Sequence, residues 1–294
     1  MDFYQSLYNP YVLCSLKSGG KMNPMLNIAV RAARRAGNIL MQGFERRDEI
    51  ESSSKGSNDY VTNFDKASEK AIVDVIRTAY PDHTIITEES GLLAGKDDEV
   101  QWIIDPLDGT TNFIKGFPHF AVSIAIRVKN RTEAAVVYNP VTNELFTAQR
   151  GKGAKMNELR LRVENLRELK GTILATGFPF KRPSLMPTQF AMMASLAEEC
   201  ADFRRTGSAA LDLCYVAANR VDGYFEADIK PWDIAAGDLI AREAGALVCD
   251  FNGMPNYLAQ GHIVATAPRL MKAMLNHIQP CLPQNFRALT KTAL

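Results

Sequence analysis

The sequence predicts a fold of mixed α+β and α/β class, in which a half built from helices and an antiparallel sheet precedes a half of alternating strands and helices. With 294 residues, 46% of them apolar, the chain can bury a core large enough for two subdomains or one layered domain. Consecutive strands give way to alternation at about residues 165–170. We therefore expect an α+β half over residues 22–165 and an α/β half over residues 166–294.

Two helical stretches open the first half. Apolar residues recur every three or four positions over residues 24–44, which is the spacing of an amphipathic helix. A second helical stretch over residues 67–79 follows Asp65 and stops before Pro81. Residues 1–21 show no period, and the Met-Asn-Pro that follows them looks like a natural start. We expect residues 1–21 to be a disordered leader or an added extension.

Strands dominate the middle of the chain and alternate with helices in the second half. We expect one antiparallel run of strands at 84–87, 100–104, 120–128, 133–138 and 144–148. In the second half, strands near Thr172, Val221 and Leu247 alternate with helices at 187–199, 208–218, 234–243 and 269–277. Such alternation is typical of an α/β unit.

Composition excludes several classes of function. The 34 Lys and Arg residues against 33 Asp and Glu leave a formal charge of +1, so no global field attracts nucleic acid, a membrane or an acidic partner. No apolar run approaches the roughly 20 residues that span a bilayer, and we expect a cytoplasmic protein. The 5 cysteines form no CxxC pair and the 4 histidines lack HExxH spacing, which argues against disulfides and a zinc site.

Acidic residues at the ends of the predicted elements form the most informative pattern. Asp105 directly follows the apolar run 102–104, and a proline and a glycine then turn the chain sharply. Thr110 and Thr111 suit the cap of a helix whose free N–H groups would form an anion site beside the acids. We expect the following acids to converge on one point: Asp65, Glu88, Glu89, Asp105, Asp108 and Asp233.

Clustered carboxylates favour hard divalent cations. Mg²⁺ takes oxygen ligands in octahedral geometry, and a pair of such ions can clamp the attacking water and the leaving oxygen of a phosphoryl transfer. Like charges that are held close together raise one another's pKa, so clustering itself indicates a bound cation. The pattern predicts a magnesium-dependent phosphatase.

Each acid also has an ordinary structural explanation. Glu88 and Glu89 alone would suit a solvated loop, and the Asp-Pro-Leu-Asp segment alone would suit a turn. Asp65 and Asp233 would each suit the N-cap of the helix that follows. These explanations do not account for the occurrence of all the acids in one chain beside an Asp-Gly-Thr-Thr segment, and we therefore prefer the metal site.

At these residues the sequence resembles the inositol monophosphatase family. The resemblance is carried by WIIDPLDGTTNF at 102–113 and PWDIAAG at 231–237, and residues 55–59 and 204–208 are similar to the bacterial SuhB-type branch in particular. It implies a layered αβαβα sandwich of the sugar-phosphatase type. It also implies hydrolysis of myo-inositol monophosphate and related small monoesters by a metal-activated water, sensitivity to Li⁺, and two or three Mg²⁺ ions per active site.

The resemblance assigns the metal ligands. Glu88, Asp105 and the backbone carbonyl of Leu107 would hold the first metal, which gives Glu88 a catalytic role. Asp105, Asp108 and Asp233 would hold the second, so that Asp105 bridges the two ions. The α+β half would thus carry most of the metal site, and the α/β half would complete the active site.

The resemblance also assigns catalytic and substrate-binding roles. Asp65 and Thr110 would align the attacking water and help to deprotonate it. The amides of Gly109 and Thr110 would bind phosphate oxygens. Ala209 and Glu226 would face the hydroxyls of a sugar-like substrate.

Two departures from the family bear on the choice of substrate. The interval from Lys55 to Asp65 is one residue shorter than in the animal enzymes, and their inositol-contacting serine has no clear match in residues 175–179. Activity on fructose bisphosphate or on nucleotide 3′-phosphates therefore stays open. A haloacid-dehalogenase mechanism is disfavoured because the aspartates are spaced i, i+3 and not i, i+2. A P-loop kinase is disfavoured because the GxxxxGK(S/T) pattern is absent.

A binding role is the alternative to catalysis. Members of the SuhB-type branch are partners of the transcription antitermination machinery on ribosomal RNA operons, which implies elongation or antitermination proteins and RNA polymerase as partners. Arginines at 31–35 and 204–205 would suit such contacts, although each cluster alone is more typical of a solvated helix face. Because the family is usually dimeric, we expect a homodimer that shares the stretch 203–205 between subunits.

Overall fold

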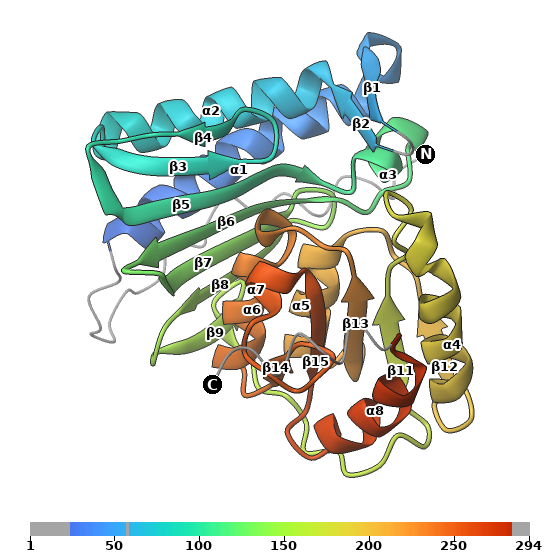
Figure 1. Cartoon of the computed structure of the whole chain (residues 1–294). Helices are drawn as coiled ribbons and strands as arrows, with labels where there is room; N and C mark the ends of the chain where they lie inside the picture. The colour runs from blue at the N-terminus through green and yellow to red at the C-terminus, as the bar shows by residue number, and fades with distance from the viewer. Residues whose placement is uncertain (1–23, 57–58, 284–294) are drawn as a thin grey trace, which may run out of the picture.

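The structure, a computed structural model, describes residues 24–56 and 59–283, without the side chains of Lys55 and Asp59. Over these residues the chain forms five layers in the order α-β-α-β-α, as Figure 1 shows. This arrangement is the layered sandwich implied by the sequence resemblance. The expected leader at 1–21 lies outside the described residues.

Helices α1 (Pro24–Glu45) and α2 (Asn63–Ala79) form the first layer and cover one face of the larger sheet. Small residues allow α1 to lie close to its neighbours. A Cβ atom at Gly37 would lie 2.5 Å from the ring of Tyr138, so this position requires glycine. The alanines on the same face are fully buried: Ala29, Ala32, Ala33 and Ala36.

The larger sheet has the strand order β10-β9-β8-β7-β6-β5-β3-β4. Its strands are β3 (His83–Thr87), β4 (Gly91–Leu93), β5 (Asp97–Asp108), β6 (Ala121–Val128), β7 (Arg131–Asn139), β8 (Glu144–Gln149), β9 (Gly153–Met156) and β10 (Leu159–Arg160). From β5 to β10 the strands are antiparallel, as expected, but β3 pairs parallel with β5. The parallel pair corrects the prediction of a purely antiparallel run, and it brings the carboxyl ends of β3 and β5 to the same edge of the sheet.

Helices α5 (Ala209–Ala217) and α6 (Pro231–Glu243) form the middle layer between the two sheets. They pack closely against each other because Gly237 has no side chain. A Cβ atom there would lie 2.7 Å from the Cβ of Leu213. Both helices begin at the edge where β3 and β5 end, and this arrangement places their first turns beside the acids (Figure 1).

The smaller sheet has the order β12-β11-β13-β15-β14. Its strands are β11 (Ile173–Thr176), β12 (Asp202–Arg204), β13 (Gly223–Ala227), β14 (Leu247–Cys249) and β15 (His262–Thr266). Helices α4 (Met186–Leu196) and α8 (Met271–Ile278) form the last layer, as Figure 1 shows. The sequence analysis missed β15, which is buried along its whole length. Its five residues do not alternate between apolar and polar, so the sequence has no strand pattern there.

Short elements complete the fold: β1 (Ser52–Gly56), β2 (Asp59–Thr62), α3 (Thr110–Lys115), α7 (Tyr257–Gln260) and 3-10 turns at Arg47–Glu49, Pro183–Leu185 and Gln279–Cys281. Strands β1 and β2 pair as a separate antiparallel hairpin. Among the described helices, none combines the length and the apolar character that a membrane span needs.

Candidate active site

A bulge in β5 brings the carboxylates of Asp105 and Asp108 to the same side of the strand. Side chains three residues apart in a regular strand point to opposite faces. Here the three steps from Asp105 to Asp108 pair with only two steps on β6, from Ser123 to Ala121. The extra residue creates a β-bulge at Pro106 and Leu107, and the bulge directs both carboxylates into one cavity.

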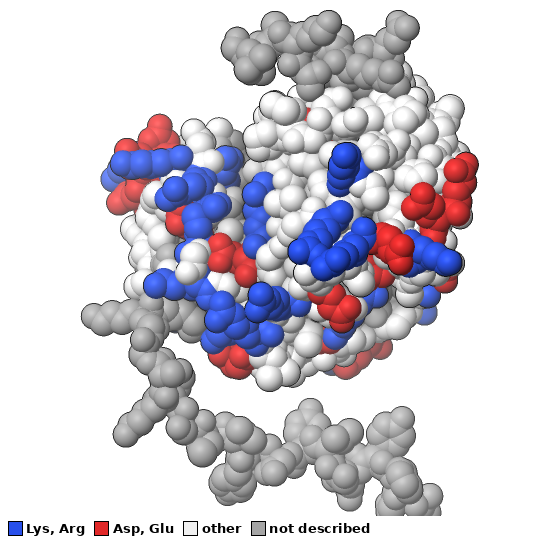
Figure 2. All heavy atoms as spheres, turned by 90° about the horizontal axis from the view of Figure 1, so that it is seen from below, with Lys and Arg blue, Asp and Glu red and all other residues white. Residues whose placement is uncertain are grey.

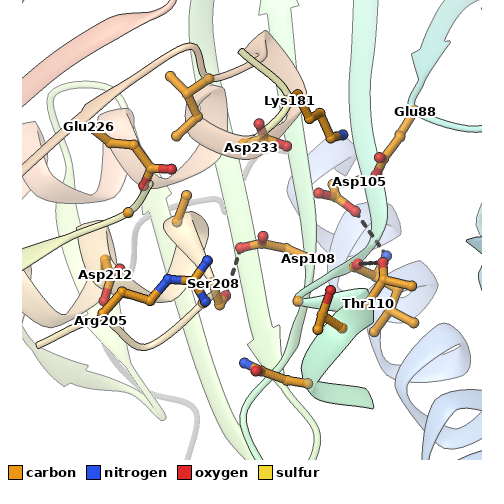
Figure 3. Close-up of a pocket in the computed structure, with 18 of the residues that line it drawn as sticks. Glu88, Asp105, Asp108, Thr110, Lys181, Arg205, Ser208, Asp212, Glu226 and Asp233 are labelled. Atoms are coloured by element: carbon orange, nitrogen blue, oxygen red, sulfur yellow. Dashed lines mark hydrogen bonds between the residues drawn. The ribbon is translucent and has the colours of Figure 1, made fainter. Parts of the chain in front are cut away.

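The parallel pairing of β3 with β5 places Glu88 next to Asp105. Thr87 pairs with Ile104, and the amide of Glu88 donates to the carbonyl of Ile104 at 3.2 Å. Glu88 and Asp105 therefore leave adjacent strands at the same level. Figure 3 shows the Glu88 carboxylate directed toward Asp105.

The first turns of α5 and α6 supply the remaining wall of the acidic cavity. The carboxylate of Asp108 accepts from the hydroxyl of Ser208, the N-cap of α5, at 2.6 Å and from the amide of Ala210 at 2.7 Å. Asp233 accepts from the amide of Lys230 at 2.8 Å, so it lies inside the first turn of α6 and is not the N-cap residue. Helix N-termini favour negative charge, which suits both acids.

Asp65 also lies in the first turn of its helix and is not the N-cap residue, which corrects the N-cap alternative. Thr62 caps α2, and Asp65 accepts from the Thr62 amide at 2.9 Å. The helix therefore starts at Asn63 and not at Ala67, because its polar first turn carries no apolar period. The second oxygen of Asp65 lies 3.1 Å from the hydroxyl of Thr110.

Thr110 differs from its expected capping role. The N-cap of α3 is Gly109, whose φ of 100° lies in the left-handed region, and no side chain caps the helix. The Thr110 hydroxyl lies 3.1 Å from Asp65 and 3.0 Å from the carbonyl of Leu107, and its single proton can be donated to either oxygen.

One cavity of about 190 Å³ collects nearly all of the site residues that the sequence indicated. Asp65 and Glu89 are not part of its wall, and Asp65 reaches it through Thr110. Figure 3 shows the acids from β5, α6 and the end of β3 facing this space. The lining includes Glu88, Asp105, Leu107, Asp108, Gly109, Thr110, Ala209, Glu226 and Asp233.

Glu226 is held by two neighbours on the smaller sheet. Its carboxylate accepts from the hydroxyl of Tyr224 at 2.7 Å. It also lies against Gly177, where a Cβ atom would be 2.1 Å from the carboxyl carbon of Glu226. Burial is the main cause that raises the pKa of Glu226 to about 7.

Burial and mutual repulsion shift the pKa values of the clustered acids upward. Burial, followed by the charges of Glu88, Asp108 and Asp233, raises the pKa of Asp105 well above its usual range. Burial also raises the pKa of Asp108 and of Asp65 to about 6. A bound cation would lower these pKa values again, because it stabilises the ionised carboxylates.

The donor chemistry fits a hard divalent cation, because the acids and the Leu107 carbonyl offer oxygen only. Within residues 24–56 and 59–283, no three Asp, Glu, His or Cys side chains already converge as a finished ligand set. The carboxylates that line the cavity would have to turn toward a common ion.

The sequence analysis did not assign several residues of the same cavity to the active site. Arg205 and Lys181 bring positive charge to it, and Asp212 and Gly177 also line it. Figure 3 shows the Arg205 side chain in the same cavity as Asp212 and Asp108. These residues come from segments with no period or spacing that would connect them to the acids, so only the tertiary structure reveals them.

Residues 21–284 match the model of the inositol monophosphatase family, and the chain belongs to this family. It is 70% identical over 266 residues to the Nus factor SuhB of Pasteurella multocida, an alignment that covers 90% of this chain and 100% of that protein. It is 63% identical over 258 residues to the Nus factor SuhB of Escherichia coli, with coverage of 88% and 97%.

Solved structures agree with this assignment. The extragenic suppressor protein SuhB from Bartonella henselae superposes with a TM-score of 0.85 at 38% identity, covering 87% of this chain and 99% of that chain. The inositol monophosphatase from Anabaena superposes with a TM-score of 0.79 at 37% identity, with coverage of 89% and 98%.

Proposed function

We propose that the protein is a Mg²⁺-dependent phosphatase that hydrolyses small phosphate monoesters, with myo-inositol monophosphate as the preferred substrate. The observation that supports this most strongly is the cavity that Glu88, Asp105, Asp108 and Asp233 share. Membership of the inositol monophosphatase family supports phosphatase chemistry independently of the cavity.

The carboxylates would hold two or three Mg²⁺ ions per active site. Glu88, Asp105 and the Leu107 carbonyl would bind one ion, and Asp105, Asp108 and Asp233 a second. When bound, Mg²⁺ supplies Lewis acidity that makes a water molecule nucleophilic and neutralises charge on the phosphate. The arrangement of all the proposed ligands around one cavity of about 190 Å³ supports this assignment.

Asp65 and Thr110 would orient the attacking water and accept its proton. Their side chains lie 3.1 Å apart, so the proton can pass from the Thr110 hydroxyl to the carboxylate. In the metal-free protein, burial raises the pKa of Asp65 to about 6, toward the range in which a carboxylate works as a general base. The first N–H groups of a helix have no partner inside it, and those of Gly109 and Thr110 would bind phosphate oxygens.

Glu226 and Ala209 would form the wall that contacts the alcohol part of the substrate. A carboxylate held by Tyr224 can accept hydrogen bonds from polyol hydroxyls, and a ligand without them would leave it unpaired at a cost of roughly 1–3 kcal/mol. Comparing kcat/KM for inositol 1-phosphate, glycerol 2-phosphate, fructose 1,6-bisphosphate and adenosine 3′,5′-bisphosphate in wild type and Glu226→Gln tests this. An equal loss on every substrate would reject Glu226 as the hydroxyl reader.

Metal dependence tests the reaction class. We expect phosphate release from inositol 1-phosphate to require Mg²⁺ and to be suppressed by excess Ca²⁺ and by Li⁺. Ca²⁺ takes more ligands at longer distances and would disturb an octahedral site. Full activity in excess EDTA would refute the proposal.

A second function is favoured by the relatives that carry the name Nus factor SuhB at 70% and 63% identity. We propose that the protein also binds transcription elongation or antitermination proteins, and RNA polymerase, in the cytoplasm. Figure 2 shows a face on which Lys and Arg side chains gather in groups with Asp and Glu beside them. Such mixed charge suits a protein partner better than nucleic acid, which prefers a continuous basic surface.

A pull-down of purified transcription factors and RNA polymerase with the tagged protein tests this second function. An Asp105→Asn variant should retain the same partners if binding does not depend on catalysis. Absence of any stable complex with these partners would reject it, whatever the outcome of the phosphatase assay.

A further inference from the structure

Helix α2 presents three buried polar side chains, Asp65, Ser68 and Glu69, to the loops of the active site. Positions i, i+3 and i+4 share one face of a helix. Asp65 contacts Thr110 at 3.1 Å, and the Ser68 hydroxyl donates to the carbonyl of Pro106 at 2.8 Å, inside the bulge of β5. Two of the three side chains thus contact the segment that carries Asp105 and Asp108.

Glu69 contacts the other segment, the turn that joins β3 to β4 and contains Glu88. One carboxylate oxygen of Glu69 accepts from the amides of Glu89 at 3.1 Å and Ser90 at 3.4 Å, and from the hydroxyl of Thr87. The other oxygen accepts from the hydroxyl of Ser90. Glu69 is only 5% exposed, although it is a charged residue.

The chemistry of this contact suits a carboxylate. The two amides can only donate, the two hydroxyls donate here, and a carboxylate offers two acceptor oxygens to all four. Burying such a charge is costly unless hydrogen bonds replace its water. The four bonds therefore fix the turn on both sides of Glu88, whose own amide is bound to the carbonyl of Ile104 at 3.2 Å.

We infer that Glu69 is a positioning residue that holds the 87–90 turn so that the Glu88 carboxylate stays beside Asp105, and that it thereby sets the affinity of the site for a divalent cation. The inference rests on the proposed function. Residues that orient metal ligands without touching the metal commonly change affinity by 10–100-fold. A residue that served only to stabilise α2 would change the melting temperature and leave the affinity for Mg²⁺ unaltered.

Calorimetric titration of Mg²⁺ into the chelator-treated full-length protein separates these roles. We expect Glu69→Ala to weaken the Kd for Mg²⁺ by about tenfold or more, while kcat at saturating Mg²⁺ falls by less than about threefold. Glu69→Gln keeps one oxygen that can accept, so its Kd should lie between those of Glu69→Ala and the wild type. Asp74→Asn, an exposed carboxylate of the same helix, is the matched control and should leave the Kd unchanged.

An unchanged Kd in Glu69→Ala, with or without a lower melting temperature, would overturn the inference. If Glu69→Ala does not fold, Ser90→Ala removes one donor from the same contact and should weaken the Kd in the same direction; no weakening there would overturn it as well. Wild-type protein that binds no Mg²⁺ would reject the proposed function together with the inference. Wild-type binding and turnover with unaffected variants would reject the inference alone.

Discussion

Asp105 is almost fully buried in the cavity, at 1% exposure, and the charges of Glu88, Asp108 and Asp233 all act on it. Its position at the start of the bulge gives it neighbours on both sides. One oxygen accepts from the amide of Leu107 at 2.9 Å, which leaves the other free to face the cavity. A carboxylate in this place is the best candidate for bridging two cations.

Replacing Asp105 by Asn tests that role. We expect phosphatase activity to fall by more than about a hundredfold, beyond the loss typical of residues that only orient ligands. The amide oxygen of Asn can still accept from Leu107, and a buried repulsive charge is removed, so the melting temperature of the metal-free protein should stay equal or rise. Circular dichroism measures the melting temperature and phosphate release measures the activity. Asp98→Asn, at the exposed start of β5, is the control. Turnover at the wild-type rate would exclude a bridging role.

Glu226 predicts a pH dependence of stability. Its pKa is raised from 4.5 to about 7 in the folded protein, so the folded state holds the proton more tightly than the unfolded chain does. The resulting stabilisation is complete below about pH 4.5 and is lost as the pH rises through about 7. In metal-free protein, urea unfolding should show a free energy of unfolding that falls by about 3 kcal/mol over this window, and Glu226→Gln should lack that part of the fall. An equal fall in both proteins would contradict the shift.

Secondary-structure elements decide how the predicted acids meet. Sequence reasoning could predict α1 because its apolar period is long, and α5, α6 and most of the larger sheet because their apolar residues form distinct runs. It could not predict that β3 runs parallel to β5, since strand direction leaves no trace in a short apolar run. Without the parallel pair, Glu88 and Asp105 would leave the sheet at opposite edges, and the predicted cluster would not form.

The bulge of β5 is a second feature beyond the reach of the sequence. The spacing i, i+3 would separate Asp105 from Asp108 in a regular strand, and only the unequal pairing with β6 brings them together. Lys181, Arg205 and Asp212 join the site through tertiary packing alone. The acids were recognisable because metal chemistry restricts the residue types, and no comparable restriction applies to the surrounding residues.

Gly177 directly follows β11 and lies against Glu226 of β13, and this contact predicts the effect of Gly177→Ala. The new methyl group would displace the flexible end of Glu226 from Tyr224 and would leave the backbone in place, so the melting temperature should change little. Loss of one hydrogen bond to the substrate corresponds to roughly 1–2 kcal/mol, and KM for inositol 1-phosphate should rise by about tenfold. Steady-state kinetics should show a smaller change for glycerol 2-phosphate. A uniform change on both substrates would indicate that Gly177 does not act through Glu226.

At the scale of the whole molecule, the site lies where the two sheets and the middle helices meet. The bonds from Ser208 and Ala210 to Asp108 join the first turn of α5 to the larger sheet. Each half alone would carry only part of the acidic wall. Catalysis is therefore expected to depend on the integrity of the whole layered fold.

Assembly is a further prediction at this scale. The ring centroids of Phe203 and Phe225, in the same chain, are 6.4 Å apart, so Phe203 packs inside its own subunit. Phe117 and Phe190, in contrast, are exposed aromatic side chains, at 55% and 56%. Exposed aromatic side chains are enriched in protein interfaces, and we expect a homodimer. Light scattering at micromolar concentration should give twice the mass of one chain, and a monomer across the whole range would rule this out.

The central claim is that the acidic cavity binds Mg²⁺, and direct binding tests it without reference to any substrate. Mg²⁺ titrated calorimetrically into chelator-treated wild type and Asp105→Asn at about pH 7.5 should give saturable binding of two or three ions in the wild type and a loss of the tightest one in the variant. Wild-type protein without saturable binding, or a variant that binds as the wild type does, would contradict the account.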